Sequence, residues 1–149
     1  LQRQCHTDEE RVGRLLDMVR TSRGKRLGLA VRALLSMKTH TTLVAAGLLS
    51  MLHAEDEELF GAATYAIGKL ARRLCSSQQD EAVRTLTERL PDIGSRARVD
   101  CCLALEQFGA AATKAIPHLL SLDHSGEESV VRLAACQAAN TIRLASMGP

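Results

Sequence analysis

Apolar residues recur along the chain at the three-and-four spacing of an amphipathic helix. The pattern itself repeats, because four segments align with one another at residues 25–37, 57–70, 96–108 and 130–142. Each segment carries anchor positions at steps of 3, 1 and 3 residues, which collects them on one stripe of a helix. The four anchor columns are Ala30, Ala63, Cys101 and Ala135; Ala33, Ala66, Ala104 and Ala138; Leu34, Ile67, Leu105 and Ala139; and Met37, Leu70, Phe108 and Ile142.

Each aligned segment is preceded by a second amphipathic segment, and turn-like stretches such as PDIGS separate the two. Thr7 followed by Glu10 has capping-box spacing, and Asp80 is a candidate N-cap. We therefore expect an all-α fold, a right-handed α-solenoid of about four hairpins and about eight helices within one domain spanning 1–149. The expected hairpins, each an A helix followed by a B helix, cover about 7–38, 41–75, 80–108 and 111–146.

The last repeat carries a family resemblance. Val131-Arg132, followed by Ala135, Ala138 and Ile142, resembles the Val-Arg-x-x-Ala-x-x-Ala-Leu pattern that opens the second helix of a HEAT repeat. Ala97-Arg98 opens a similar segment, and Pro117 stands at the usual kink of the preceding helix. In the first two copies Leu27 and Phe60 replace the arginine, which leaves the related armadillo repeat open as an alternative. The resemblance implies an α-solenoid.

Composition agrees with helices packed on helices. Hydrophobic residues make up 46% of the chain, yet Phe60, Tyr65 and Phe108 are the only aromatic residues, so small aliphatic side chains dominate. No stretch is apolar enough to suggest membrane insertion. The chain starts without Met, and we expect it to be part of a longer protein. Five cysteines without a CxxC motif favour reduced thiols, and hence a cytoplasmic location, with the nucleus as the alternative.

The sequence offers little chemistry for an enzyme. The five histidines show no metal-ligand spacing, and the repeated His-Glu pairs of the similarly folded deoxyhypusine hydroxylases do not occur. Cys101 and Cys102 are neighbours in an expected helix, so they point about 100° apart. Cys101 occupies an alanine column, which predicts a buried structural thiol, with a regulatory thiol or a metal site as the alternative. We therefore expect no catalytic residue, no metal and no cofactor.

Two charged clusters allow more than one interpretation. The run Glu55–Glu58 precedes a B helix, where it complements the helix dipole, with an acidic docking edge as the alternative. The basic cluster lies in the turn of the first expected hairpin, where we expect its side chains to be solvated. It consists of Arg20, Arg23, Lys25 and Arg26. Its alternative is a nucleic-acid or phosphorylated-ligand site in the basic N-terminal half. The aligned column at Arg32 is basic only once, which argues against nucleic acid.

The leading hypothesis is a non-catalytic scaffold that binds another protein along a concave B-helix face. Tyr65 points about 200° away from the buried Ala63, and Lys69 and Arg72 continue that outward ridge. We expect the ridge to bind an amphipathic helix or extended peptide. Alternatively, Leu103 and Leu133 pack between B helices. The last helix is apolar over much of its circumference, which suggests self-association or further chain. The expected partner-binding residues are Arg32, Tyr65, Lys69, Arg72, Val99, Leu103, Gln107, Leu133, Gln137 and Thr141.

Overall fold

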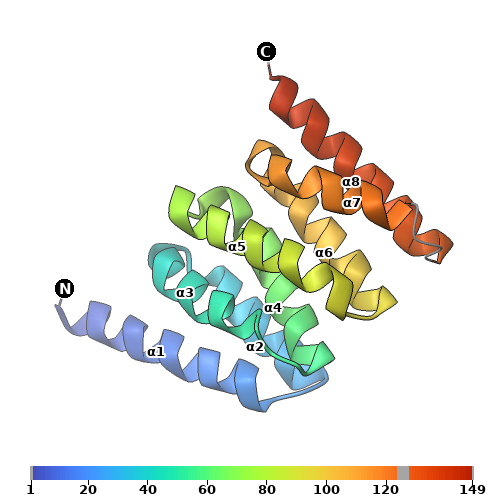
Figure 1. Ribbon diagram of the computed structural model, residues 1–149. Coiled ribbons are helices and arrows are strands. Elements are labelled where there is room, and N and C mark those ends of the chain that lie inside the picture. The colour runs from blue at the N-terminus through green and yellow to red at the C-terminus, as the bar shows by residue number, and fades with distance from the viewer. Residues whose placement is uncertain (1, 124–127, 149) are drawn as a thin grey trace. The chain divides into compact units, whose positions relative to one another are not determined.

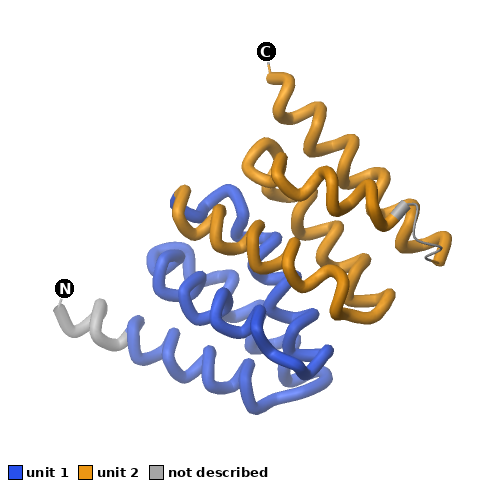
Figure 2. The backbone as a smooth tube through the Cα atoms, viewed as in Figure 1, with its two compact units in different colours: residues 1–75 blue, residues 76–149 orange. Residues whose placement is uncertain are grey.

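The fold is all-helical, as predicted. The computed structural model describes residues 2–123 and 128–148, and within this part of the chain every regular element is a helix (Figure 1). The chain divides into two compact units, unit 1 at residues 1–75 and unit 2 at residues 76–149 (Figure 2). The division falls between the second and third predicted hairpins.

Unit 1 is a pair of stacked hairpins. Helices α1 and α2 form one hairpin and α3 and α4 the other, while α1 also packs on α3 and α2 on α4. Gly47 permits the close approach of α3 to α1, because a Cβ atom there would lie 2.5 Å from Leu16 Cδ1. The elements are α1 (Gln2–Thr21), α2 (Lys25–Ser36), η1 (Lys38–His40), α3 (Thr41–Met51), α4 (Glu57–Leu70) and η2 (Ala71–Arg73).

Unit 2 repeats the plan with one irregular A helix. Helices α5 and α6 pair, α7 and the 3₁₀ segment η4 pack against α8, and α6 packs on α8. Pro117 is compatible with only the first turn of an α-helix, and α7 accordingly starts at Ile116 after the 3₁₀ segment. The elements are α5 (Ser76–Arg89), η3 (Leu90–Asp92), α6 (Ser95–Phe108), η4 (Gly109–Ala115), α7 (Ile116–Asp123) and α8 (Ser129–Met147).

The aligned anchor columns form the core of both units. Ala63, Cys101 and Ala135 are fully inaccessible, as are the larger Ile67 and Leu105 from the third column. Alanine and cysteine are small enough for a neighbouring helix to come close, and the larger side chains fill the remaining space. Two members of the first copy depart from the pattern, because Ala33 and Met37 are only half-buried, and Met37 lies beyond the end of α2.

Both predicted caps are wrong. Helix α1 begins at Gln2 and α5 begins at Ser76, so Thr7 and Asp80 lie inside helices. The first turn of α5 is the polar stretch SSQQ, which contains no apolar residue to reveal the helix. Apolar periodicity therefore marks the start of the buried stripe, which comes one turn after the start of the helix.

Candidate protein-binding faces of the B helices

The B helices of unit 1, α2 and α4, enclose a shallow groove of about 320 Å³. Arg32 from α2 and Tyr65 from α4 both line it, and both side chains are exposed. The aligned register predicts this meeting, because the two residues occupy the same column of consecutive B helices. The other lining residues are small or apolar and are Gly28, Val31, Leu35 and Ala62.

Lys69 extends this face by one helical turn. Its Nζ atom lies 5.4 Å from the centroid of the Tyr65 ring, which is cation–π geometry. The contact holds an ammonium group beside the phenol ring of Tyr65, a residue that is 57% exposed. Arg72, in η2, is exposed as well. Unit 1 therefore carries a cationic and aromatic face with room for a side chain of a partner.

The B helices of unit 2, α6 and α8, carry a more apolar face. Leu103 is 50% exposed and Leu133 is 62% exposed, so packing between the B helices does not bury them. Gln107 and Gln137 are exposed too. The expectation of an exposed Val99 is wrong, because its side chain is half-buried. Val99 is in register with Gly28, which faces the neighbouring B helix in unit 1.

Thr141 and Glu106 join the two helices of this face. The Thr141 hydroxyl donates a hydrogen bond to Glu106 Oε1 at 2.8 Å, across 35 residues of sequence. Thr141 therefore has a structural contact as well as the exposure that a binding residue needs. Eight of the ten expected binding residues, Thr141 included, lie on B helices and have exposed side chains. Of the other two, Val99 is half-buried and Arg72 follows the end of α4.

The adjacent cysteines of α6 lie beneath this face and are inaccessible. Burial raises the pKa of the Cys101 thiol far above its ordinary value and raises that of Cys102 to about 12. Both thiols are therefore protonated at neutral pH and are poor nucleophiles and ligands. Burial also raises the pKa of the Asp100 carboxyl, against the opposing charge of Arg96. Within the described residues, no three His, Cys, Asp or Glu side chains gather as a metal site.

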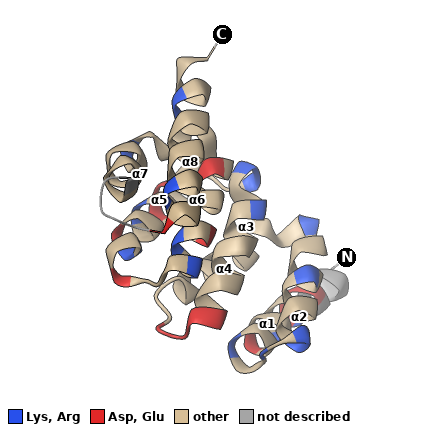
Figure 3. Ribbon diagram, turned by 90° about the vertical axis from the view of Figure 1, so that its right-hand side faces the viewer, with Lys and Arg blue, Asp and Glu red and all other residues tan. Residues whose placement is uncertain are grey.

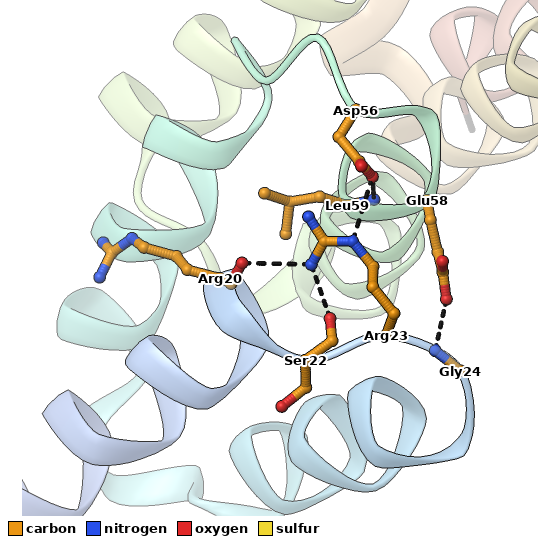
Figure 4. A network of polar contacts seen from close by, with 7 residues as sticks. All are labelled: Arg20, Ser22, Arg23, Gly24, Asp56, Glu58 and Leu59. Atoms are coloured by element: carbon orange, nitrogen blue, oxygen red, sulfur yellow. Dashed lines mark hydrogen bonds and ion pairs between the residues drawn. The ribbon is translucent and has the colours of Figure 1, made fainter.

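The acidic run and the basic turn, which the sequence presents separately, bind each other in unit 1 (Figure 4). Arg23 Nε lies 3.3 Å from Asp56 Oδ1, and the Gly24 amide donates a hydrogen bond to Glu58 Oε1. These contacts connect the turn after α1 to the first turn of α4, where the acidic residues gather (red in Figure 3). They give Arg23, Asp56 and Glu58 a structural role.

Asp56 is also the N-cap of α4. Its carboxylate accepts a hydrogen bond from the Leu59 amide at 2.9 Å. This hydrogen bond and the nearby Arg23 guanidinium hold the pKa of the Asp56 carboxyl below its ordinary value. The favourable negative charge predicted at the start of this helix is thus provided by Asp56 as the N-cap residue.

A second groove, of about 740 Å³, lies in unit 2 between α5 and η4. The sequence does not predict this groove, because Ala110 and Ala111, whose short side chains line it, look like ordinary positions of an A helix. Its rim carries both signs of charge. The other lining residues are Asp80, Val83, Arg84, Thr87, Glu88, Pro91, Thr113, Lys114 and His118.

Comparison with known proteins identifies the fold but no family. No family model and no curated protein matches the chain. One similar solved structure is the crystal structure of an engineered protein, a target of the Northeast Structural Genomics Consortium. It shares 18% identity at a TM-score of 0.64, over 88% of this chain and 62% of the engineered chain. The chain thus matches less than two thirds of that protein. No helix in the described part of the chain has the length and apolar character needed to cross a membrane.

Proposed function

We propose that the chain is a non-catalytic protein-interaction scaffold of the HEAT type, with its hairpins forming a right-handed α-solenoid. The B-helix faces bind an amphipathic helix or an extended peptide of another protein. The observation that carries this proposal is the exposed set of Arg32, Tyr65 and Lys69 around the groove between α2 and α4. A tyrosine next to cations is a typical anchor of protein interfaces, which are enriched in Tyr and Arg.

The two faces suggest the chemistry of the partner. The cations of unit 1 suit an acidic segment, because rim charges orient a partner and speed its association. In unit 2, Leu103 and Leu133 are large apolar side chains left in water. Their burial against a partner would remove apolar surface at about 25 cal/mol per Å². We expect a bound peptide to combine acidic residues with an apolar stripe.

A peptide-display selection on the purified chain tests the proposal. Selected peptides should carry acidic and apolar residues, and Lys69→Glu and Leu103→Asp should each weaken their binding by about tenfold or more. Arg11→Glu on α1 and Leu120→Asp on α7 are matched controls, because both residues are exposed on A helices. The melting temperature should stay near that of the parent for all four. Equal weakening by the control variants, or no enriched peptide, would contradict the proposal.

The nucleic-acid alternative has less support. The Arg23 guanidinium of the basic turn is paired with Asp56, and Arg20 Nη1 lies 3.1 Å from Asp17 Oδ1. Binding of DNA or RNA that falls steeply with salt would nevertheless favour this alternative. For location we propose the cytoplasm or the nucleus, where the thiols of Cys101 and Cys102 would remain reduced.

A further inference from the structure

Helix α8 carries a second apolar stripe that faces solvent. Val130, Leu133, Leu144 and Met147 are 60%, 62%, 70% and 73% exposed. The exposed amide side chains of Gln137 and Asn140 lie between these apolar residues, and the six positions together recur at alternating steps of three and four residues. This is the heptad spacing of a coiled-coil seam. The stripe lies opposite the buried one on the same helix. In order, it consists of Val130, Leu133, Gln137, Asn140, Leu144 and Met147.

The aligned repeats show what this face of a B helix does elsewhere. Leu133, Gln137 and Asn140 correspond to Gly28, Arg32 and Leu35 of α2. Those three residues line the side of α2 that faces α4, where the two B helices stack within unit 1. The outer stripe of α8 is therefore built on a stacking face.

The stripe is the same in both directions along the helix. From either end it contains two apolar residues, then two amides, then two apolar residues. A two-fold interface requires this symmetry, because residue i contacts residue j and residue j contacts residue i. We propose that two copies of the chain associate through an antiparallel pair of α8 helices. Val130 then meets the partner subunit's Met147, Leu133 meets the partner subunit's Leu144, and Gln137 meets the partner subunit's Asn140.

The charges of α8 permit this pairing. Arg132 and Arg143 are the only charged residues within the helix, and both lie beside the stripe. In the antiparallel register each arginine is level with an alanine of the partner, so like charges do not face each other. The central amides can hydrogen-bond across the axis, and a polar pair within an apolar seam fixes its register. The inference does not depend on the proposed peptide-binding function.

Sedimentation velocity over a wide concentration range tests the dimer. The parent chain should shift from monomer to dimer, and Leu144→Asp should raise the dimer Kd by roughly 100-fold. Leu144 is 70% exposed, so circular dichroism should show an unchanged fold. Leu120→Asp, on the A helix α7, is the matched control and should leave the Kd unchanged. A parent chain that stays monomeric at every concentration would overturn the proposal. That result is expected if a different polypeptide segment, and not a second copy of the chain, covers this stripe of α8.

A pair of double variants tests the antiparallel register. In the antiparallel dimer, position 137 of each copy meets position 140 of the other, so Gln137→Glu with Asn140→Lys forms two pairs of opposite charges. This double variant should still dimerise. Gln137→Lys with Asn140→Lys places like charges together and should weaken it by about tenfold or more. In a parallel pair the Glu/Lys combination would itself bring like charges together. Weakening of the dimer by both combinations would therefore refute the antiparallel arrangement. The dimer seam shares Leu133 and Gln137 with the expected peptide-binding residues, so a second copy and a peptide compete for these two side chains. The Leu144→Asp variant changes neither residue and should capture the peptide at least as well as the parent chain, so the two proposals can fail separately.

Discussion

Replacing Ile67 by alanine tests whether the third anchor column is the core of unit 1. Ile67 is completely inaccessible in α4, and the change removes three carbon groups. At about 0.8 kcal/mol each, their transfer from water accounts for about 2.4 kcal/mol. The cavity that remains raises the expected loss of unfolding free energy to about 3–4 kcal/mol. A unit the size of residues 1–75 has about 4–11 kcal/mol in total, so the change should remove at least about a quarter of its stability.

Urea unfolding measures this loss directly. Tyr65 is the only tyrosine and the chain has no tryptophan, so tyrosine fluorescence reports on unit 1 while circular dichroism reports on both units. With a slope near 1.5 kcal/mol/M, the fluorescence midpoint should fall by about 2 M urea. Leu29→Ala is the control in the same unit, because its side chain is 63% exposed and its loss should stay within about 0.5 kcal/mol.

Similar losses of unfolding free energy in the two variants would contradict the assignment of the core. A loss below about 0.5 kcal/mol for Ile67→Ala would mean that the column does not define the core, because even a site that collapses without a cavity loses the transfer contribution. A large loss for Leu29→Ala would show that the exposed side of α2 is packed in solution. Either result would require a different register for the aligned segments.

Three further outcomes are expected. Ala135→Leu should overpack the close contact of α8 and lower the unfolding free energy by roughly 1–3 kcal/mol, which thermal melts would detect. Asp56→Asn should lower the melting temperature at neutral pH. The lowered folded-state pKa of Asp56 means that its contribution is present above the unfolded value of about 3.9 and is lost as the pH falls through the folded value, so parent and variant should converge in acid. Cys101 and Cys102 should resist a thiol reagent at pH 8 until urea is added, whereas the exposed Cys75 and Cys136 should react at once; prompt labelling of the buried pair would contradict their burial.

The sequence predicts the core well, because burial on a helix follows its period. Ala63, Ile67 and Leu70 recur at helical spacing, and each is inaccessible in the structure. The same register predicts that Arg32 and Tyr65 are neighbours, since equivalent residues of stacked B helices lie level with each other. The close contact between Tyr65 and Lys69 follows from their spacing of four residues.

Contacts between turns are beyond this kind of prediction. The pairing of Arg23 with Asp56 depends on the geometry of two irregular segments, and no periodicity connects them. Helix ends are similarly hidden, because the polar first turn of α5 resembles a loop. The 3₁₀ geometry of η4 depends on local backbone preferences that hydrophobic spacing does not record, including Gly109 at φ 57° and the nearby Pro117.

The contacts between the turn after α1 and the start of α4 have a consequence for proteolysis. The turn and the helix ends on either side of it are dense in trypsin sites, with Arg20, Arg23, Lys25 and Arg26 within seven residues. A protease must draw this segment into an extended conformation, which requires release of Arg23 from Asp56 and of Gly24 from Glu58. Cleavage there therefore depends on local opening between the two hairpins of unit 1. Two carboxylates of the acidic run, those of Asp56 and Glu58, thus influence how long a segment more than 30 residues away survives intact.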